Sequence, residues 1–309
     1  MSYFAFLNIL ETGFLFGLVA LGTYISFRVL AFPDMTVDGS FATGAAVAAA
    51  LISKNGNPWL ATALAVLIGM ICGLVTALLN RRFGMLHLLA GILTTIGLYS
   101  VDLRIMASPN IPLMTKVTVL TPFMNLGLAE PEVHVVFAAI VCITATVLLA
   151  LFLMSEFGLA MRATGINPRM ARANGSSIDM NVYVGLGLSN GLVALAGALF
   201  AQAAGFADVS MGSGTILFGL AAVILGEVLV QSSSILLVLL ACVAGSILYR
   251  LAVGLALNSQ FLGFQSSDLR LVTAVLVAIA FVISAKRGKW SLRRPKKVPS
   301  SSEIRSVAP

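Results

Sequence analysis

Long apolar runs separated by short polar breaks make up most of the chain up to about residue 285. A helix needs about 20 apolar residues to cross the hydrocarbon core of a bilayer. Nine runs reach or approach this length, so the pattern predicts an all-α polytopic membrane protein with nine transmembrane helices, or eight if the second run only re-enters the membrane. The predicted spans are 8–30, 39–54, 58–79, 85–107, 133–154, 181–204, 213–230, 233–257 and 270–285.

The composition supports a lipid environment. Of the 309 residues, 59% are hydrophobic and 10% are charged, whereas an ordinary soluble domain has about 25% charged residues. These polar residues are too few to cover the surface of a soluble fold of this length. The same composition excludes intrinsic disorder for most of the chain. Membrane lipid is therefore the first expected partner.

The charge distribution divides the chain into two parts. Residues 286–309 hold eight Lys or Arg and one Glu and thus account for the whole net charge of +7. We expect a transmembrane domain over 1–285 and a basic, disordered tail over 286–309. A basic cluster next to a span favours the cytoplasmic side and anionic lipid. The bias predicts an external N-terminus and a cytoplasmic C-terminus, and no nucleic-acid partner.

Two polar segments resemble each other and suggest an internal repeat. Asp34–Ser40 and Asp208–Ser213 each follow a long apolar run and precede a helix rich in Ala and Gly. They predict inverted repeats of spans 1–4 and 6–9, in which broken helices expose backbone groups along a transport pathway. The alternative is that both segments are ordinary helix N-caps. The candidate pathway or helix-break residues are Asp34, Thr36, Asp38, Ser40, Asp208 and Ser210.

Sequence motifs for catalysis are lacking. The chain contains no P-loop, because its only Gly-Lys pair, Gly288-Lys289, is followed by Trp290. His87 and His134 have no Cys or His neighbour at metal-ligand spacing. We therefore expect no enzyme activity, no metal and no cofactor.

Among the charged residues inside predicted spans are four of interest, Asp102, Arg104, Glu227 and Arg250. Charge within the membrane marks a functional site by default. Each of the four is near a span end, so we expect it to reach the interface by snorkelling. No span carries the central series of Asp, Glu and His that a proton-coupled carrier needs, which disfavours secondary transport.

Two longer polar stretches are predicted, an outer loop over 108–132 and an inner loop over 155–180. In the inner loop, Asn167 is a good N-cap, Pro168 suits the first helical position and Gly175 suits the residue after the last turn. These signals predict a helix of about two turns over 168–174, bracketed by Gly165 and Gly175 as swivels. We expect this helix to be a docking knob for a soluble partner or to lie on anionic lipid. Its expected apolar surface is Met170, Ala171 and Ala173, and its basic surface is Arg169 and Arg172.

The same inner loop resembles a known family. The run from Phe157 to Gly175, with Arg162-Ala163, Asn167-Pro168 and Ala171-Arg172, resembles the cytoplasmic coupling loop of bacterial ABC-importer permeases of the branched-chain amino acid/ribose type. The Asp34–Ser40 and Ala221–Gly226 segments are similar to two further motifs of that family. The resemblance is closest to the branch of uncharacterised or tryptophan-type permeases. The chain departs from the family in having Gly226-Glu227 where a second Gly is frequent, and it lacks the extra first span of ribose-type members.

The resemblance implies a function and partners. It implies the permease of an ABC importer for a small solute, first of all an amino acid, in the bacterial inner membrane. The implied partners are a cytosolic ABC ATPase, a periplasmic or lipid-anchored solute-binding protein and a second permease copy, most simply as a homodimer. A stand-alone secondary transporter or channel, or a structural membrane subunit, are the alternatives. The implied coupling residues are Asn167, Pro168, Arg169, Met170, Ala171, Arg172 and Gly175.

Overall fold

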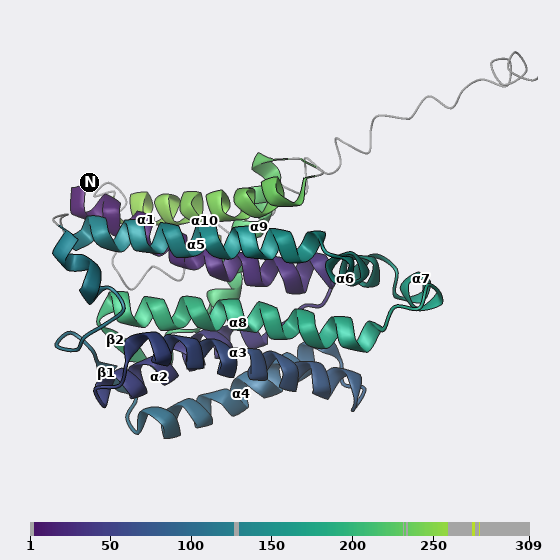
Figure 1. Ribbon diagram of the computed structural model, residues 1–309, viewed down its shortest axis with the longest axis horizontal. Coiled ribbons are helices and arrows are strands. Elements are labelled where there is room, and N and C mark those ends of the chain that lie inside the picture. Colours follow the sequence, from purple (N-terminus) through teal and green to yellow (C-terminus); the bar gives the residue numbers. More distant parts are fainter. Residues whose placement is uncertain are drawn as a thin grey trace, which may run out of the picture.

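The computed structural model describes residues 3–126, 130–230, 232, 234–258, 274, 275 and 278. Within these residues the chain is almost entirely helical (Figure 1). The α-helices are α1 (Tyr3–Thr23), α2 (Thr36–Ser53), α3 (Pro58–Arg81), α4 (His87–Met106), α5 (Glu130–Met154), α6 (Glu156–Ile166), α7 (Pro168–Ala173), α8 (Ile178–Ala204), α9 (Thr215–Leu229) and α10 (Ile235–Asn258). A π-helix, η1 (Tyr24–Val29), and a 3-10 helix, η2 (Thr121–Leu126), complete the helical elements, and the strands are β1 (Asn110–Pro112) and β2 (Phe206–Asp208).

The prediction of an all-α membrane protein is confirmed. Seven helices of the described residues are long and apolar enough to cross a membrane. They coincide with the first six predicted spans and the eighth. The seventh predicted span, 213–230, forms α9, which has only 15 residues. The ninth predicted span and the tail over 286–309 lie outside the described residues, apart from 274, 275 and 278.

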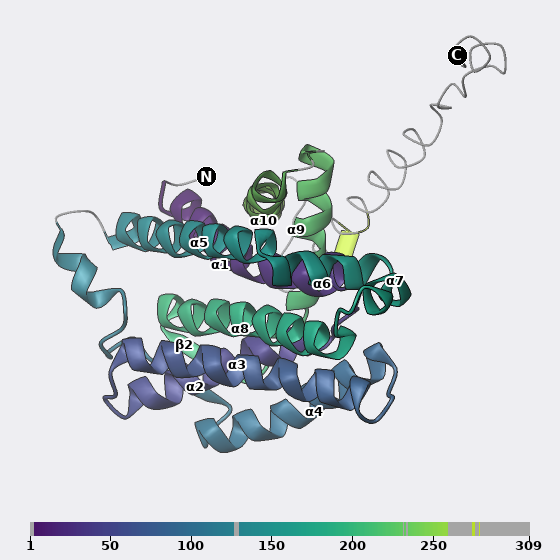
Figure 2. The same cartoon turned by 45° about the vertical axis from the view of Figure 1, so that its right-hand side comes forward.

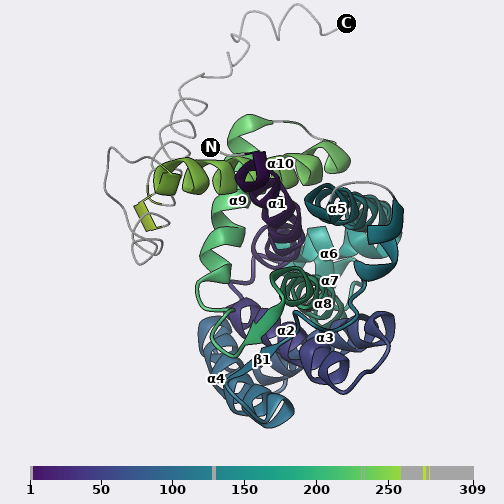
Figure 3. The same ribbon diagram turned by 90° about the vertical axis from the view of Figure 1, so that its left-hand side faces the viewer.

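Helix α8 is the centre of the bundle. It packs against α2 and α3 on one side and against α1 on the other. Figure 2 shows α2, α3 and α4 grouped on one side of α8, and α1, α5 and α10 on the opposite side. Seen along the bundle in Figure 3, α9 extends from α10 along one flank toward α2. The strands and the start of α1 lie at one end of the bundle, here called the β end, and α6 and α7 lie at the opposite end, the α7 end (Figure 1).

Small residues allow the central helices to approach closely. A Cβ atom at Gly73 would overlap the carbonyl oxygen of Leu186 in α8, and a Cβ atom at Gly69 would overlap the side chain of Ala194. The sequence pair Gly69/Gly73 is thus a helix-packing motif, as its spacing predicts. The opposite face of α3 exposes large apolar side chains, among them Leu67 and Ile71. In a membrane this face contacts lipid.

Two chain breaks interrupt the regular bundle. At the end of α1 the chain passes through η1, and Ala31 then adopts a positive φ of 52° before the chain turns back into α2. After α8, the left-handed Gly205 ends the helix, and β2 pairs antiparallel with β1. The chain then returns into the bundle and begins α9. These breaks contain the two segments that resemble each other in sequence.

Candidate functional site

Helix α7 is short but capped at both ends. The Asn167 side-chain oxygen accepts a hydrogen bond from the Met170 N–H at 3.1 Å, and Pro168 occupies the first helical position. At the other end the Asn174 side chain donates to the Met170 carbonyl at 3.1 Å, and Gly175 has a φ of +81°. The backbone N–H of Ser176 donates to the Ala171 carbonyl at 3.0 Å. The predicted start and caps of this helix are therefore present, and the helix ends at Ala173, one residue before the predicted end.

The exposed surface of α7 differs from the predicted one. Ala171 is 3% exposed and faces the bundle, so its assignment to the apolar outer surface is wrong. Met170 is 59% exposed, and Ile166, at the end of α6, is 87% exposed. Arg169 and Arg172 are also exposed. We call Ile166, Arg169, Met170 and Arg172 the docking patch; it joins two apolar side chains to two guanidinium groups.

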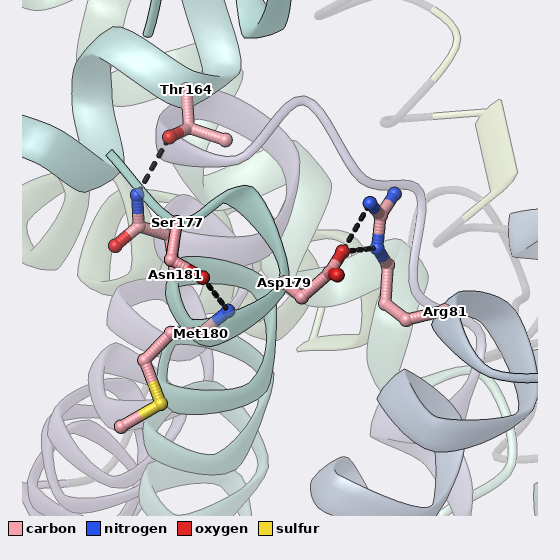
Figure 4. A network of polar contacts seen from close by, with 6 residues as sticks. All are labelled: Arg81, Thr164, Ser177, Asp179, Met180 and Asn181. Atoms are coloured by element: carbon pink, nitrogen blue, oxygen red, sulfur yellow. Dashed lines mark hydrogen bonds and ion pairs between the residues drawn. The ribbon is translucent and has the colours of Figure 1, made fainter. Parts of the chain in front are cut away.

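A polar network fixes the base of α7 to the bundle (Figure 4). The Asn181 amide of α8 donates to Thr164 Oγ1 of α6 at 2.7 Å and to Ser176 Oγ at 2.9 Å. Ser177 caps α8 by accepting from the Met180 N–H. Asp179, in the first turn of α8, pairs with Arg81 at the end of α3, with 2.6 Å between Arg81 Nε and Asp179 Oδ1. The α7 segment is thereby tied to α3, α6 and α8.

Gly165 is not a swivel. It lies inside α6, and a Cβ atom there would overlap the carbonyl oxygen of Val29 in η1. The glycine is needed for close packing rather than for backbone freedom, so the prediction of a flexible bracket is wrong at this position. Of the two glycines predicted to bracket α7, Gly175 has a left-handed backbone and Gly165 does not. The contact joins the α7 segment to the π-helix that precedes α2, and a cavity of about 470 Å³ lies between η1, α7 and the ends of α3 and α8.

The candidate residues of the first break form a buried network. Asp34, Thr36 and Ser40 have no exposed surface. Asp34 Oδ1 accepts from the Thr36 N–H at 2.8 Å, and Asp34 Oδ2 accepts from the Asn190 amide at 2.7 Å. Ser40 donates to Asn190 Oδ1 at 2.7 Å, and Thr36 shares a hydrogen bond of 2.6 Å with Thr76. Asn190 of α8, which sequence reasoning missed, is thus the central partner of this break.

Asp38 connects the first break to the second. Its carboxylate accepts from the Gly214 N–H at 3.0 Å and from the Ile216 N–H at 2.7 Å. These N–H groups belong to the N-cap residue and the first turn of α9, where negative charge is favourable. A Cβ atom at Gly212 would overlap the carbonyl oxygen of Asp38, so the two segments are in direct backbone contact. The two similar segments therefore meet inside the bundle, with α2 and α9 starting from this point.

Asp208 and Ser210 lie apart from this network, at the β end. Asp208 Oδ1 accepts from both the N–H and the hydroxyl of Ser210. The hydrogen bond from the Ser210 side chain lowers the pKa of Asp208 below its ordinary value, so this carboxylate is ionised at neutral pH. Both residues line a cavity of about 630 Å³ that also contains Arg250.

The charged residues of the spans do not all snorkel. Asp102 is 1% exposed and accepts from Thr43 at 3.1 Å, so the expectation of an interfacial side chain is wrong for it. Arg250 is also held inside, with its guanidinium stacked on the rings of Phe16 and Phe218. Glu227 forms an ion pair with Arg28 of η1. Arg104 is exposed near the β end, as expected. The sequence shows that these charged residues lie within spans, but it does not show which residues they contact.

Comparisons with known proteins give a uniform result. The family model described as "Branched-chain amino acid transport system / permease component" matches residues 5–284. The chain is 37% identical over 303 residues to the "Tyrosine transport system permease protein" of Clostridioides difficile (strain R20291), covering 97% of this chain and 98% of that protein. It is 32% identical over 271 residues to an uncharacterized protein of Rickettsia prowazekii (strain Madrid E), covering 86% of this chain and 92% of that protein. Among solved structures, PsaBC from Streptococcus pneumoniae in complex with Fab has a TM-score of 0.51 at 13% identity, over 91% of this chain and 92% of that chain, which shows similarity of fold.

Proposed function

Because this chain belongs to the branched-chain amino acid transport permease family, we propose that it is the membrane-spanning subunit of an ATP-binding-cassette importer for an amino acid. The chain is a permease component of a transport system and not an enzyme. In the proposed assembly a separate cytosolic ATPase hydrolyses ATP, and a periplasmic or lipid-anchored binding protein delivers the solute from outside. A second copy of the chain completes the pore in the bacterial inner membrane.

The observation that carries this proposal is the doubly capped α7 with its exposed docking patch. Isolated short helices are unstable in water, so a six-residue helix that projects from the bundle needs its caps and its anchors. The docking patch has the composition of a protein interface, in which exposed apolar side chains and Arg contribute most of the affinity. A lipid-facing helix has no need for the ties to α3, α6 and α8. We therefore assign the docking patch to the ATPase.

The packing around Gly165 supports a path for the movement. When the ATPase subunits close, they would displace α7 as a rigid body. Asn181 and the contact of Gly165 with Val29 prevent α7 from moving alone. The displacement would thus reach α8 and η1, and from η1 it would reach the break that contains Asp34. Asp38 would carry it on to α9, because its carboxylate holds the first turn of that helix.

The contact between the two breaks supports the inverted repeat. Helices that start inside the membrane and point away from one another are typical of transporter repeats, and they place polar groups along the pathway. Asp34, Thr36, Asp38 and Ser40 would then belong to the hinge of the pathway, and Asp208 and Ser210 to its outer mouth. Nine spans, with the last one over 270–285, would put the N-terminus outside and the C-terminus in the cytosol. The basic tail would then lie against anionic lipid.

The nature of the solute follows from the relatives. The family is described by branched-chain amino acid transport, and the relative from Clostridioides difficile is named for tyrosine transport. Both descriptions support an amino-acid cargo. Secondary transport remains the competing proposal, and it predicts uptake into vesicles that contain the chain without any ATPase.

The test is purification of the tagged chain from its native membranes, with ATP hydrolysis and Walker-motif peptides measured in the eluate. We expect the wild-type chain to retain an ATPase, and the variant Arg169→Ala/Met170→Ala/Arg172→Ala to retain at least roughly tenfold less, because one interface residue that contributes about 1.4 kcal/mol is enough for a tenfold loss of affinity. The matched control is Arg82→Ala/Phe83→Ala, which removes an exposed basic and an exposed apolar side chain at the same end. Equal retention by both variants, or no ATPase with the wild-type chain, would refute the proposal.

A further inference from the structure

A cavity of about 630 Å³ at the β end is not explained by the coupling role of α7. It lies between α1, α8, α9 and α10 and is bordered by the segment that follows β2. Its volume is in the range of about 300–1,000 Å³ that is usual for small-molecule sites. Four phenylalanines, an arginine and an aspartate line it, namely Phe16, Phe200, Phe206, Phe218, Arg250 and Asp208. None of the coupling residues is near it, so it needs an explanation of its own.

Arg250 is held in this cavity by aromatic rings. Its guanidinium carbon lies 3.9 Å from the centroid of the Phe16 ring and 4.8 Å from that of Phe218. Cation–π contacts with two rings, which come from α1 and α9, hold the guanidinium group in this cavity. The phenyl rings carry no oxygen or nitrogen acceptor, so these contacts leave guanidinium N–H donors available to a ligand.

Arg250 has no counter-ion in the described part of the chain. Three ion pairs form among the described residues, and none includes Arg250: Arg28 with Glu227, Arg81 with Asp179 and Glu11 with His134. No carboxylate of the described residues lies within ion-pair distance of Arg250, and its Nε is buried without a hydrogen-bond partner there. A partly buried cation without a counter-ion is costly. An anionic ligand that binds in the plane, such as a carboxylate, would lower this cost through a bidentate pair.

The opposite charge is present on another wall. Asp208 is ionised at neutral pH, and its Oδ1 is already occupied by Ser210. Asp208 and Arg250 line one cavity without pairing with each other, so the cavity offers one positive and one negative group at separate points. A zwitterion that carries a carboxylate and an ammonium group matches this arrangement. A simple anion or a sugar would leave one of the two charges without a partner.

The remaining walls select for the side chain of such a ligand. The ring of Phe16 lies 5.2 Å from that of Phe218 and 5.7 Å from that of Phe200, the latter edge-to-face. Phe206 is 40% exposed at the same cavity. Aromatic rings arranged in this way favour another aromatic ring in offset or edge-to-face contact.

We propose that this cavity is the permease's own solute site, and that it binds an α-amino acid with an aromatic side chain. Arg250 binds the carboxylate, Asp208 binds the ammonium group, and the phenylalanines surround the aromatic ring. The proposal rests on the amino-acid importer function above and adds a site and a substrate class to it. The solute released by the binding protein would enter at the β end and rest here before passage.

The test uses the full chain, co-purified with its ATPase and placed in lipid nanodiscs, with Ser213→Cys as a reporter in the cavity wall. Cys72, Cys142 and Cys242 are buried, so the parent chain gives the labelling background for N-ethylmaleimide. We expect L-phenylalanine and L-tyrosine to slow labelling of the reporter. Three other solutes should protect the reporter only at concentrations at least roughly tenfold higher. They are tyramine, which lacks the carboxylate, 3-phenylpropionate, which lacks the ammonium group, and L-leucine, which lacks the aromatic ring. Protection by tyramine or L-leucine at the concentration of L-phenylalanine, or no protection by any solute, would overturn the proposal.

A variant pair separates the role of Arg250 from charge alone. Arg250→Lys keeps the charge but loses the planar fork, and it should raise the protective concentration of L-phenylalanine roughly tenfold. Arg104→Lys, at an exposed arginine of the same end, should leave it unchanged. An unchanged protective concentration in Arg250→Lys would overturn the assignment. If that variant does not fold, the solute series on the Ser213→Cys chain still tests whether the cavity binds an aromatic amino acid. ATPase retention in the same sample separates the proposed importer function from the proposed solute site. If the ATPase is retained but no solute slows labelling, only the proposal of the solute site is refuted.

Discussion

The contact between Asp38 and the start of α9 provides the sharpest test of how the two breaks are held together. Asp38→Ala removes the acceptors of two backbone N–H groups, those of Gly214 at 3.0 Å and Ile216 at 2.7 Å. Both groups belong to the first turn of a helix and have no alternative partner within that helix. The substitution also removes the negative charge that favours this helix end.

The expected loss can be worked out from these contacts. A buried donor without its acceptor costs about 1–3 kcal/mol, so two of them give about 2–6 kcal/mol. Hydrogen bonds in membrane proteins are often weaker, at about 0.6 kcal/mol on average, because the unfolded chain in the membrane also finds partners. We therefore expect a loss at the low end of this range, about 2–3 kcal/mol. Asp38→Asn should lose less, because its amide oxygen can still accept one of the two bonds.

The assay is thermal unfolding of the purified chain in one detergent, with wild type, Asp38→Asn and Asp38→Ala compared side by side. At about 2–4 °C per kcal/mol for a large domain, we expect Asp38→Ala to lower the Tm by roughly 4–12 °C. The matched control is Asp208→Ala, which removes a carboxylate with two comparable acceptor bonds at a more exposed turn and should lower the Tm by much less. A Tm for Asp38→Ala within 1 °C of the wild-type value would refute the argument that Asp38 joins the two breaks.

Three further predictions follow from other contacts. Gly165→Ala should abolish most ATP-driven uptake into proteoliposomes, because its methyl group would overlap the Val29 carbonyl and separate α6 from η1; uptake at the wild-type rate would contradict this. Asn167→Ala should reduce ATPase retention several-fold, since an N-cap is worth about 1 kcal/mol, and Asn167→Ser should restore it. The lowered pKa of Asp208 means that its turn is stabilised above the ordinary carboxyl pKa and loses this stability only as the pH falls through the lower, folded value. Amide-exchange protection of Ser210, corrected for intrinsic rate, should therefore be constant between pH 8 and 5; a decline in that window would contradict the assignment.

The parts of the structure that the sequence predicted depend on local signals. A cap is decided by residues within one turn of each other, so Asn167, Pro168 and Gly175 were sufficient to define α7. The positions of the spans depend on runs of about 20 apolar residues, so they could likewise be predicted from the sequence. The four-residue spacing of Gly69 and Gly73 is a local signal of the same kind, since it is typical of close helix crossings.

The parts that the sequence did not predict depend on distant partners. Asp38 and Ile216 are 178 positions apart, and no pattern within either segment shows that they touch. Arg250 was expected at the interface because it is near a span end, but two rings from other helices retain it in the bundle. Ala171 was expected on the outer apolar surface and is buried for a similar reason, since the face that α7 turns inward is set by its anchors. Residues over 259–273 and 279–309 lie outside the described structure, so the last span and the tail stay predictions.

The central claim is that the docking patch on α7 contacts an ATPase in the cytosol. The most direct measurement is photocrosslinking from a benzoylphenylalanine placed at Met170, carried out in native membranes of cells that produce the full chain. We predict a crosslinked product that contains a Walker-motif protein and that disappears when Arg169 and Arg172 are both changed to Ala. Crosslinks to lipid alone, or to a protein on the outer face of the membrane, would contradict it.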